Sequence, residues 1–153
     1  MGLASGMDDK HLRAFGRIAV GFGEMDFLIH YCITMTLGDV ETAEMISDEL
    51  MLFARRLKFI SVVFKKKFAN DPTRQKQFAL LKTAIKTVQD KRKDILHAAW
   101  YVEPSNAALV AQIAAKTEGP GPRLTYSVAD LNQIAGEVEK VNEEFMSFVV
   151  DMV

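Results

Sequence analysis

The chain has 153 residues, of which 49% are apolar and 25% are charged, and this composition predicts one soluble globular domain with a sizeable core. Its single cysteine, Cys32, excludes an intrachain disulfide framework and a cysteine-rich zinc site, and it favours a reducing cytoplasm. The sequence contains neither an uninterrupted apolar run of about 20 residues nor a signal segment, so we expect no membrane association. Residues 1–6, MGLASG, are typical of a disordered tail or a vector remnant, so the predicted domain covers residues 7–153.

The net charge of -1 conceals three blocks of different sign. Residues 1–54 carry a net charge of -6, residues 55–93 carry +11, and residues 94–153 carry -6. The middle block can attract polyanions, although its lysines could equally solvate the outer faces of two helices. The residues that we predict to contact an anion or nucleic acid are Arg55, Arg56, Lys58, Lys65, Lys66, Lys67, Lys82 and Lys86.

Two helical regions are expected before residue 70. The first begins after Asp8 and Asp9, keeps an apolar residue every three or four positions, and ends at Leu37 before Gly38. The second runs from about Val40 to Ala69, with a break expected near Ser47. Its predicted buried positions are Met51, Phe53, Ala54, Leu57, Ile60, Val63 and Phe64.

A third helix is predicted from Asp71, which can act as the N-cap, and from Pro72, which suits the first helical position. Its apolar pattern continues toward Trp100. The GPGP sequence of residues 119–122 then excludes helix, and the segments on either side could pair as a small hairpin, although residues 107–115 could equally form a short helix.

The last predicted helix follows Ser127 and Asp130, which form a variant of the capping box. An apolar face from Leu131 to Val149 continues toward the C-terminus. The predicted fold is therefore all-α, a four- or five-helix and mostly antiparallel bundle with a small β-hairpin before the last helix.

Residues 91–100, KRKDILHAAW, place Arg92 and His97 at the end of the basic block. Histidine can exchange a proton near neutral pH, and arginine offers planar donors that suit phosphate oxygens. An arginine, four intervening residues, and a histidine followed by two small residues and a tryptophan resemble the R-x4-6-H motif of HEPN domains. That helical family contains many metal-independent ribonucleases. The order of elements is also similar, although Lys93 replaces the usual Asn, Asp or His and Ala98 replaces the common glycine.

The resemblance implies a role for each residue of the motif. His97 would act as general base or acid, and Arg92 would stabilise charge while a ribose 2′-hydroxyl attacks the adjacent phosphate without a metal. Lys93 and Asp94 would support His97, and Asp26 would face Arg92 from the first helix. The family commonly pairs two motifs across a dimer, so the resemblance also implies a homodimer.

The spacing of the motif also permits a structural interpretation. On an ideal helix Arg92 and His97 lie about 140° apart, so they share a face only if the arginine wraps round or the helix distorts. A histidine near a helix C-terminus can instead interact with the terminal carbonyl groups.

Two functions from different classes follow from these features. The first is a metal-independent endoribonuclease, in a toxin–antitoxin or defence system. The alternative is a noncatalytic helical module whose basic block binds an anionic ligand, nucleic acid or an acidic protein partner such as an antitoxin. The sequence contains no histidine-carboxylate metal spacing and no glycine-rich phosphate loop, so we expect neither a metal nor a cofactor.

Overall fold

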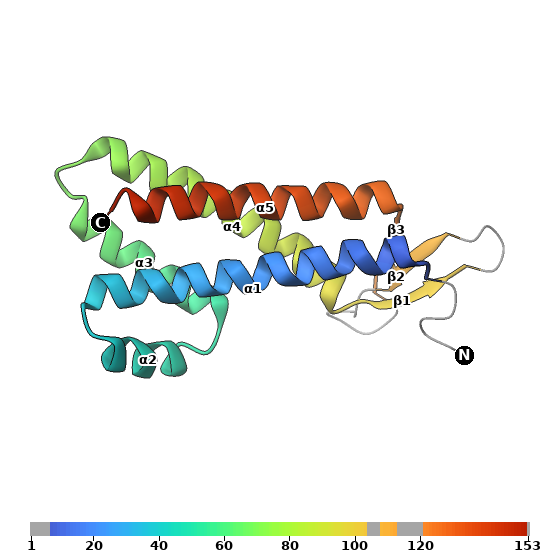
Figure 1. The fold of residues 1–153 in the computed structure, drawn as a ribbon, viewed down its shortest axis with the longest axis horizontal. Coiled ribbons are helices and arrows are strands. Elements are labelled where there is room, and N and C mark those ends of the chain that lie inside the picture. The colour runs from blue at the N-terminus through green and yellow to red at the C-terminus, as the bar shows by residue number, and fades with distance from the viewer. Residues whose placement is uncertain (1–6, 104–107, 113–120, 153) are drawn as a thin grey trace. The chain divides into compact units, whose positions relative to one another are not determined.

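The computed structural model describes residues 7–103, 108–112 and 121–152. The chain is mostly helical (76%), and a small antiparallel sheet of three strands precedes the last helix (Figure 1). The helices are α1 (Asp9–Leu37), α2 (Val40–Glu49), α3 (Phe53–Lys67), α4 (Pro72–Leu96) and α5 (Val128–Val150). The strands are β1 (Ala99–Val102), β2 (Leu109–Gln112) and β3 (Arg123–Tyr126). The prediction of an all-α, mostly antiparallel bundle is therefore confirmed in part: the fold is mostly helical with antiparallel helix contacts, but it also contains a sheet of three strands.

The chain divides into two compact units. Unit 1 comprises Met1–Phe22 and Thr87–Glu139, and unit 2 comprises Gly23–Lys86 and Lys140–Val153. Helices α1, α4 and α5 each contribute residues to both units. The prediction that residues 7–153 form one HEPN-like domain stays a prediction.

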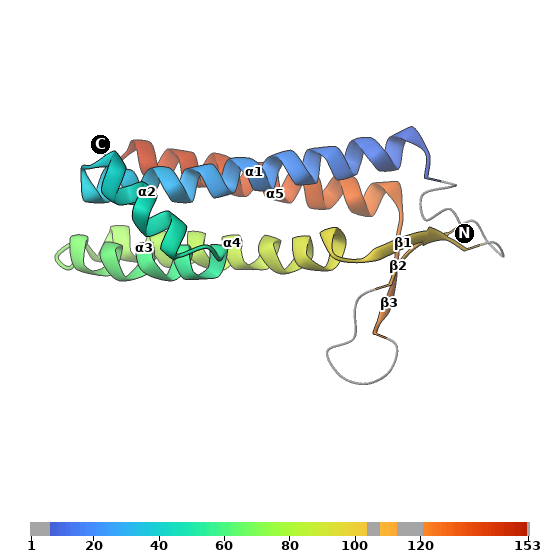
Figure 2. The ribbon, with the colours of Figure 1, turned by 90° about the horizontal axis from the view of Figure 1, so that it is seen from below.

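In unit 2, α3 and the first part of α4 form an antiparallel helical pair (Figure 2). Their apolar residues recur at helical spacing and are buried, so the two helices share a core. Four phenylalanine rings form a cluster in this core, with centroids 4.8 to 6.0 Å apart: Phe64, Phe68, Phe78 and Phe148. Aromatic packing of this kind fixes the separation of α3 and α4.

The predicted helix boundaries at Gly38, Asp71 and Ser127 are confirmed by their contacts. Gly38 follows α1 with a φ angle of 69°, which a side chain would strain. The Asp71 carboxylate accepts a hydrogen bond of 3.0 Å from the Arg74 N–H and caps α4. The Ser127 hydroxyl accepts from the Asp130 N–H at 3.0 Å, while the Asp130 carboxylate accepts from the Ser127 N–H at 2.7 Å.

Two boundaries differ from the prediction. The second helical region breaks at residues 50–52 rather than near Ser47, because α2 closes with the Leu50 N–H bonded to the Ile46 carbonyl. Met51 and Ala54 were predicted to be buried, but both are exposed. Met51 lies in this connection and is 78% exposed. Helix α4 ends at Leu96, so His97 follows the helix and Trp100 belongs to β1.

The predicted pairing of the segments around GPGP is confirmed, because β2 and β3 are antiparallel with Leu109 opposite Tyr126 and Gln112 opposite Arg123. The third strand, β1, was not predicted and pairs with the other edge of β2. The Trp100 ring of β1 packs against Phe15 of α1, with centroids 4.7 Å apart, and its indole N–H donates to the Ile95 carbonyl at 2.8 Å. These contacts anchor the sheet within unit 1.

Among the described residues, α1 is long and apolar enough to cross a membrane, with 44% of its apolar window buried inside the protein. Its apolar residues are not continuous, because charged residues such as Glu24 and Asp26 lie among them. Core helices of globular proteins have the same length and composition, so this property does not define a cellular location.

Candidate functional site

Unit 2 carries ten basic side chains on α3 and α4. Arg56 is paired with Asp26 and Arg74 donates to the Asp151 carbonyl, and the other eight make up what we call the basic α3–α4 surface. All are exposed except Lys82, which is partly buried. None forms an ion pair with an acidic side chain in the part of the chain that the structure describes. Their positive charge is therefore available to an external anion. The members are Arg55, Lys58, Lys65, Lys66 and Lys67 on α3 and Lys76, Lys82 and Lys86 on α4.

A groove of about 200 Å³ between α3 and α4 brings two of these lysines together. Lys65 lines it from α3 and Lys82 lines it from α4. Its floor is apolar because the phenylalanine cluster lies beneath it. The remaining lining residues are Ser61, Phe64, Phe68, Gln75, Phe78 and Ala79.

Arg56, predicted from the same basic block, lies in a different environment. Its guanidinium group forms an ion pair of 2.8 Å with Asp26 of α1, and its side chain is 15% exposed. This pair engages Asp26, whose predicted place opposite Arg92 stays a prediction. Arg56 therefore contributes less to an external anion site than the exposed lysines do.

The predicted catalytic Arg92 lies in unit 1, near the end of α4. Its guanidinium carbon is 5.3 Å from the centroid of the Phe22 ring, which is a cation–π contact. Its Nε atom is buried and has no hydrogen-bond partner among the residues that the structure describes. Arg92 thus retains donor capacity but is partly covered by the core of unit 1.

His97 lies in the turn after α4, and its side chain is exposed. Its backbone N–H donates to the Lys93 carbonyl at 3.3 Å, which continues the helical pattern for one residue. Within residues 7–103, 108–112 and 121–152, no hydrogen bond or ion pair joins its imidazole to Arg92, Lys93 or Asp94. The structure therefore shows the predicted motif without the side-chain contacts that would organise it.

The neighbours of the motif have other contacts in unit 1. Lys91 forms an ion pair with Glu137 of α5, and the hydrogen bond from Lys91 lowers the pKa of that carboxyl group. Burial raises the pKa of Tyr126, and the charge of Asp94 adds to this effect. Asp94 thus acts electrostatically on β3, while Lys93 remains exposed.

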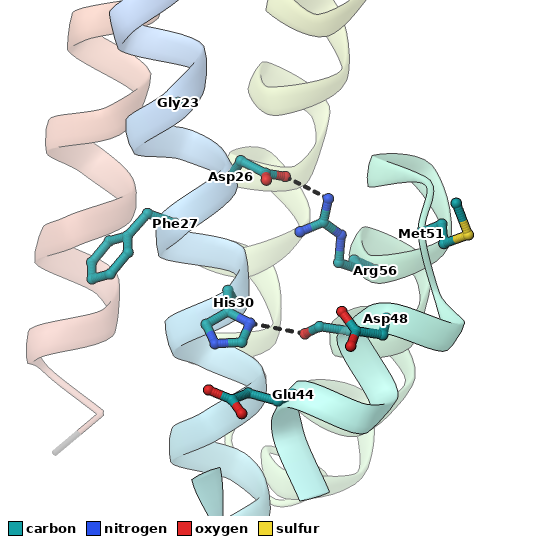
Figure 3. Close-up of a pocket in the computed structure, with 9 residues that line it drawn as sticks. Gly23, Asp26, Phe27, His30, Glu44, Asp48, Met51 and Arg56 are labelled. Atoms are coloured by element: carbon teal, nitrogen blue, oxygen red, sulfur yellow. Dashed lines mark hydrogen bonds and ion pairs between the residues drawn. The ribbon is translucent and has the colours of Figure 1, made fainter. Parts of the chain in front are cut away.

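A larger cavity, of about 860 Å³, lies in unit 2 and was not predicted from the sequence (Figure 3). Two contacts connect its walls: the Asp26–Arg56 pair links α1 to α3, and the His30 Nδ1 atom lies 2.9 Å from the Ser47 hydroxyl, which links α1 to α2. Its remaining lining residues are Gly23, Phe27, Glu44, Asp48 and Met51. Figure 3 shows Asp48 beside the His30–Ser47 contact, whereas the Phe27 ring points away from the Asp26–Arg56 pair, on the other side of α1.

This cavity has no clear signature in the sequence because its walls come from three helices. His30 has no histidine or cysteine partner at metal-binding spacing, and Ser47 is 17 positions away from it. The available sign was α2 itself, which carries Glu41, Glu44, Asp48 and Glu49 without a basic residue. An acidic helix next to a basic one indicates two separate charged surfaces.

Burial raises the pKa of the Cys32 thiol to about 12, so it is protonated at neutral pH. No group of three or more His, Cys, Asp or Glu side chains within the described part of the chain could hold a metal ion.

The chain matches no protein-family model, no curated protein and no solved structure.

Proposed function

We propose that the chain binds nucleic acid, and RNA in particular, through the basic α3–α4 surface. The observation that carries this proposal is the set of eight basic side chains without an acidic partner among the described residues. Lysines that neutralise phosphates release counterions, which favours binding to a polyanion independently of its sequence. Lys65 and Lys82 approach one groove from two helices, so they offer a phosphate two cations at once.

The test is the salt dependence of binding to a labelled single-stranded RNA of about 20 nucleotides. If four phosphates are contacted, log Kobs should fall with log [KCl] with a slope of about -3. Lys65→Glu/Lys82→Glu should weaken binding about 100-fold at low salt and flatten the slope. The matched control is Lys10→Glu/Lys140→Glu, which changes the charge equally at exposed positions outside the basic α3–α4 surface. Equal losses in both variants would contradict the proposal.

A second candidate function is metal-independent RNA cleavage by a HEPN-like bundle, with Arg92 and His97 as catalytic residues. It is supported by the exposed imidazole of His97, which has no side-chain partner among the described residues, and by the unpaired Nε of Arg92. Both residues follow the basic α3–α4 surface along the chain. In this proposal two copies pair their motifs in a cytoplasmic homodimer, and an acidic antitoxin is the partner that covers the basic residues.

Cleavage of a mixed RNA pool in EDTA tests the second candidate. His97→Ala should lower the rate at least about 100-fold, and the products should end in a 2′,3′-cyclic phosphate. His11→Ala is the matched control, because His11 also lies in unit 1 but is bonded to Asp8. Cleavage that survives His97→Ala would exclude this histidine as the catalytic group. RNA binding without cleavage by the wild type would contradict the second candidate and agree with the first.

A further inference from the structure

We propose that two copies of this chain pair in antiparallel orientation through an apolar face of α1, which we call the outer face of α1. Its residues lie four or seven positions apart along one continuous helix, so they share one side of that helix. They are Leu12, Gly16, Val20, Phe27, Tyr31 and Met35. None belongs to the basic α3–α4 surface or to the Arg92–His97 motif, so the proposal does not rest on either proposed function.

The large aliphatic and aromatic side chains of the outer face are open to solvent. Those between 39% and 64% exposed are Leu12, Val20, Phe27 and Met35. Figure 3 shows the Phe27 ring directed away from the Asp26–Arg56 pair. Only 44% of the apolar window of α1 is buried, whereas a core helix buries most of its apolar residues. A stripe of exposed apolar side chains along a helix marks an interaction surface.

The charged residues of the same helix are bonded to neighbouring helices. Residues 14–37 contain three Asp, Glu, Lys or Arg side chains, and each has a partner on another helix. Arg17 pairs with Glu139 of α5 at 2.8 Å, and Glu24 accepts a hydrogen bond of 3.1 Å from α5. Asp26 pairs with α3 at 2.8 Å. The outer face therefore has no charged side chain that would keep it in water.

The order of small and large residues along the outer face is self-complementary. Val20 and Phe27 lie equally far from a midpoint between residues 23 and 24, and the same holds for Gly16 and Tyr31. About a two-fold axis at this midpoint, Phe27 of one copy meets Val20 of the other. The Tyr31 ring meets Gly16, where an added Cβ atom would have no atom within 4 Å. A second copy is therefore the occupant that this order of residues fits.

The size of the outer face suits a weak and reversible dimer. The rings of Phe27 and Tyr31 are stacked with centroids 6.3 Å apart, and aromatic side chains of this kind contribute much of the energy of protein interfaces. The exposed side chains present roughly 450 Å² per chain, so two copies would bury on the order of 1,000 Å², the lower limit for a specific interface.

The border of the outer face favours a second copy over a lipid surface. Its charged residues are one cation, Arg17, and two carboxylates, those of Glu24 and Glu139. Helices that bind anionic membranes carry Lys and Arg beside their apolar side, because the lipid headgroups attract them. A border with a net negative charge is repelled by such a membrane.

Sedimentation equilibrium of the full chain between about 5 and about 300 µM measures the self-association. Val20→Lys and Phe27→Glu should each raise the dissociation constant of the dimer at least about tenfold, because each would bury an unpaired charge. Combining them in one chain should recover at least about threefold of the lost affinity, since antiparallel pairing brings the two opposite charges together. The matched control is Val62→Lys/Leu80→Glu, which changes equally exposed apolar residues of α3 and α4.

The control should leave the dissociation constant within about twofold of the wild type, because its residues lie outside the outer face. Equal weakening by the control would overturn the proposal, since it would reveal general apolar association. A wild type that stays monomeric over the whole range would also overturn it. A combined variant weaker than both single variants would contradict the antiparallel pairing. Binding of the monomer to phosphatidylcholine–phosphatidylglycerol vesicles through Val20 and Phe27, without self-association, would assign the face to a membrane instead.

Discussion

Unit 2 contains two charged regions that are built differently. The basic α3–α4 surface consists of exposed side chains without acidic partners among the described residues, and its groove has a volume of about 200 Å³. The acidic cavity has about 860 Å³ and walls joined by an ion pair and a hydrogen bond. The positive charges of the first region can attract a polyanion, whereas the carboxylates that line the second repel one.

The largest expected effect concerns the apolar floor of the basic groove. Phe64 is 1% exposed, so Phe64→Ala should lower the free energy of unfolding by about 3 to 5 kcal/mol in urea titrations. Phe27, on the rim of the acidic cavity, is 61% exposed, and Phe27→Ala should cost less than about 1 kcal/mol. Similar losses for the two variants would contradict the distinction between a core floor and a surface rim.

A smaller loss of stability is expected when the ion pair in the cavity wall is removed. Arg56→Ala removes the partner of Asp26 and should lower the free energy of unfolding by about 1 to 2 kcal/mol. A double-mutant cycle with Asp26→Ala should give a coupling energy of about 1 kcal/mol. Additive effects of the two substitutions would show that the ion pair does not stabilise the wall.

Cys32 lies on the buried side of α1, and its burial should make the free energy of unfolding depend on pH. Its pKa is raised by burial to about 12, so between about pH 9 and 12 the unfolded state loses the thiol proton while the folded state retains it. Stability should therefore be fully present below about pH 9 and fall by up to about 1.4 kcal/mol per pH unit above it. Cys32→Ala should remove this contribution to the decrease of stability with pH. Urea unfolding midpoints measured between about pH 8 and about pH 10 would show the difference. An unchanged slope would place the thiol in contact with water.

The smallest stability effects are expected for two glycines of unit 2, Gly38 and Gly23. Gly38→Ala should cost about 1 kcal/mol, since its φ angle of 69° disfavours a side chain in the turn that leads into α2. Gly23→Ala should stabilise the protein by up to about 1 kcal/mol, because Gly23 is helical and a Cβ atom there meets no atom within 4 Å. Thermal melts would measure both, and a gain at Gly38 would contradict the assigned turn.

The helices were predictable because their boundaries depend on local chemistry. Asp71 with Pro72, Gly38, and Ser127 with Asp130 each satisfy or terminate a helix through neighbouring residues. Strand β1 was missed because Ile95 and Leu96 continue a helical apolar pattern up to Ala99–Val102, and a short apolar run does not distinguish strand from helix.

The sites were predictable only in part, since each depends on contacts between distant residues. The exposed lysines followed from the charge blocks, but the convergence of Lys65 and Lys82 on one groove required the α3–α4 pair. Arg56 looked equivalent to Arg55 in the sequence, and only the position of Asp26 on α1 separates them. The cavity unites residues that are up to 33 positions apart, from Gly23 to Arg56, which no local pattern could show.

The central claim is that nucleic acid binds to the basic α3–α4 surface and not to the acidic cavity of unit 2, and one comparison of variants tests it most directly. The affinity for a single-stranded RNA should be measured for Lys65→Glu/Lys82→Glu and for Glu44→Gln/Asp48→Asn at the same salt concentration. The account predicts that the lysine variant binds RNA about 100-fold more weakly, whereas the acidic-cavity variant stays within about threefold of the wild type. RNA binding that is unaffected by the lysine variant, or weakened equally by both, would contradict it.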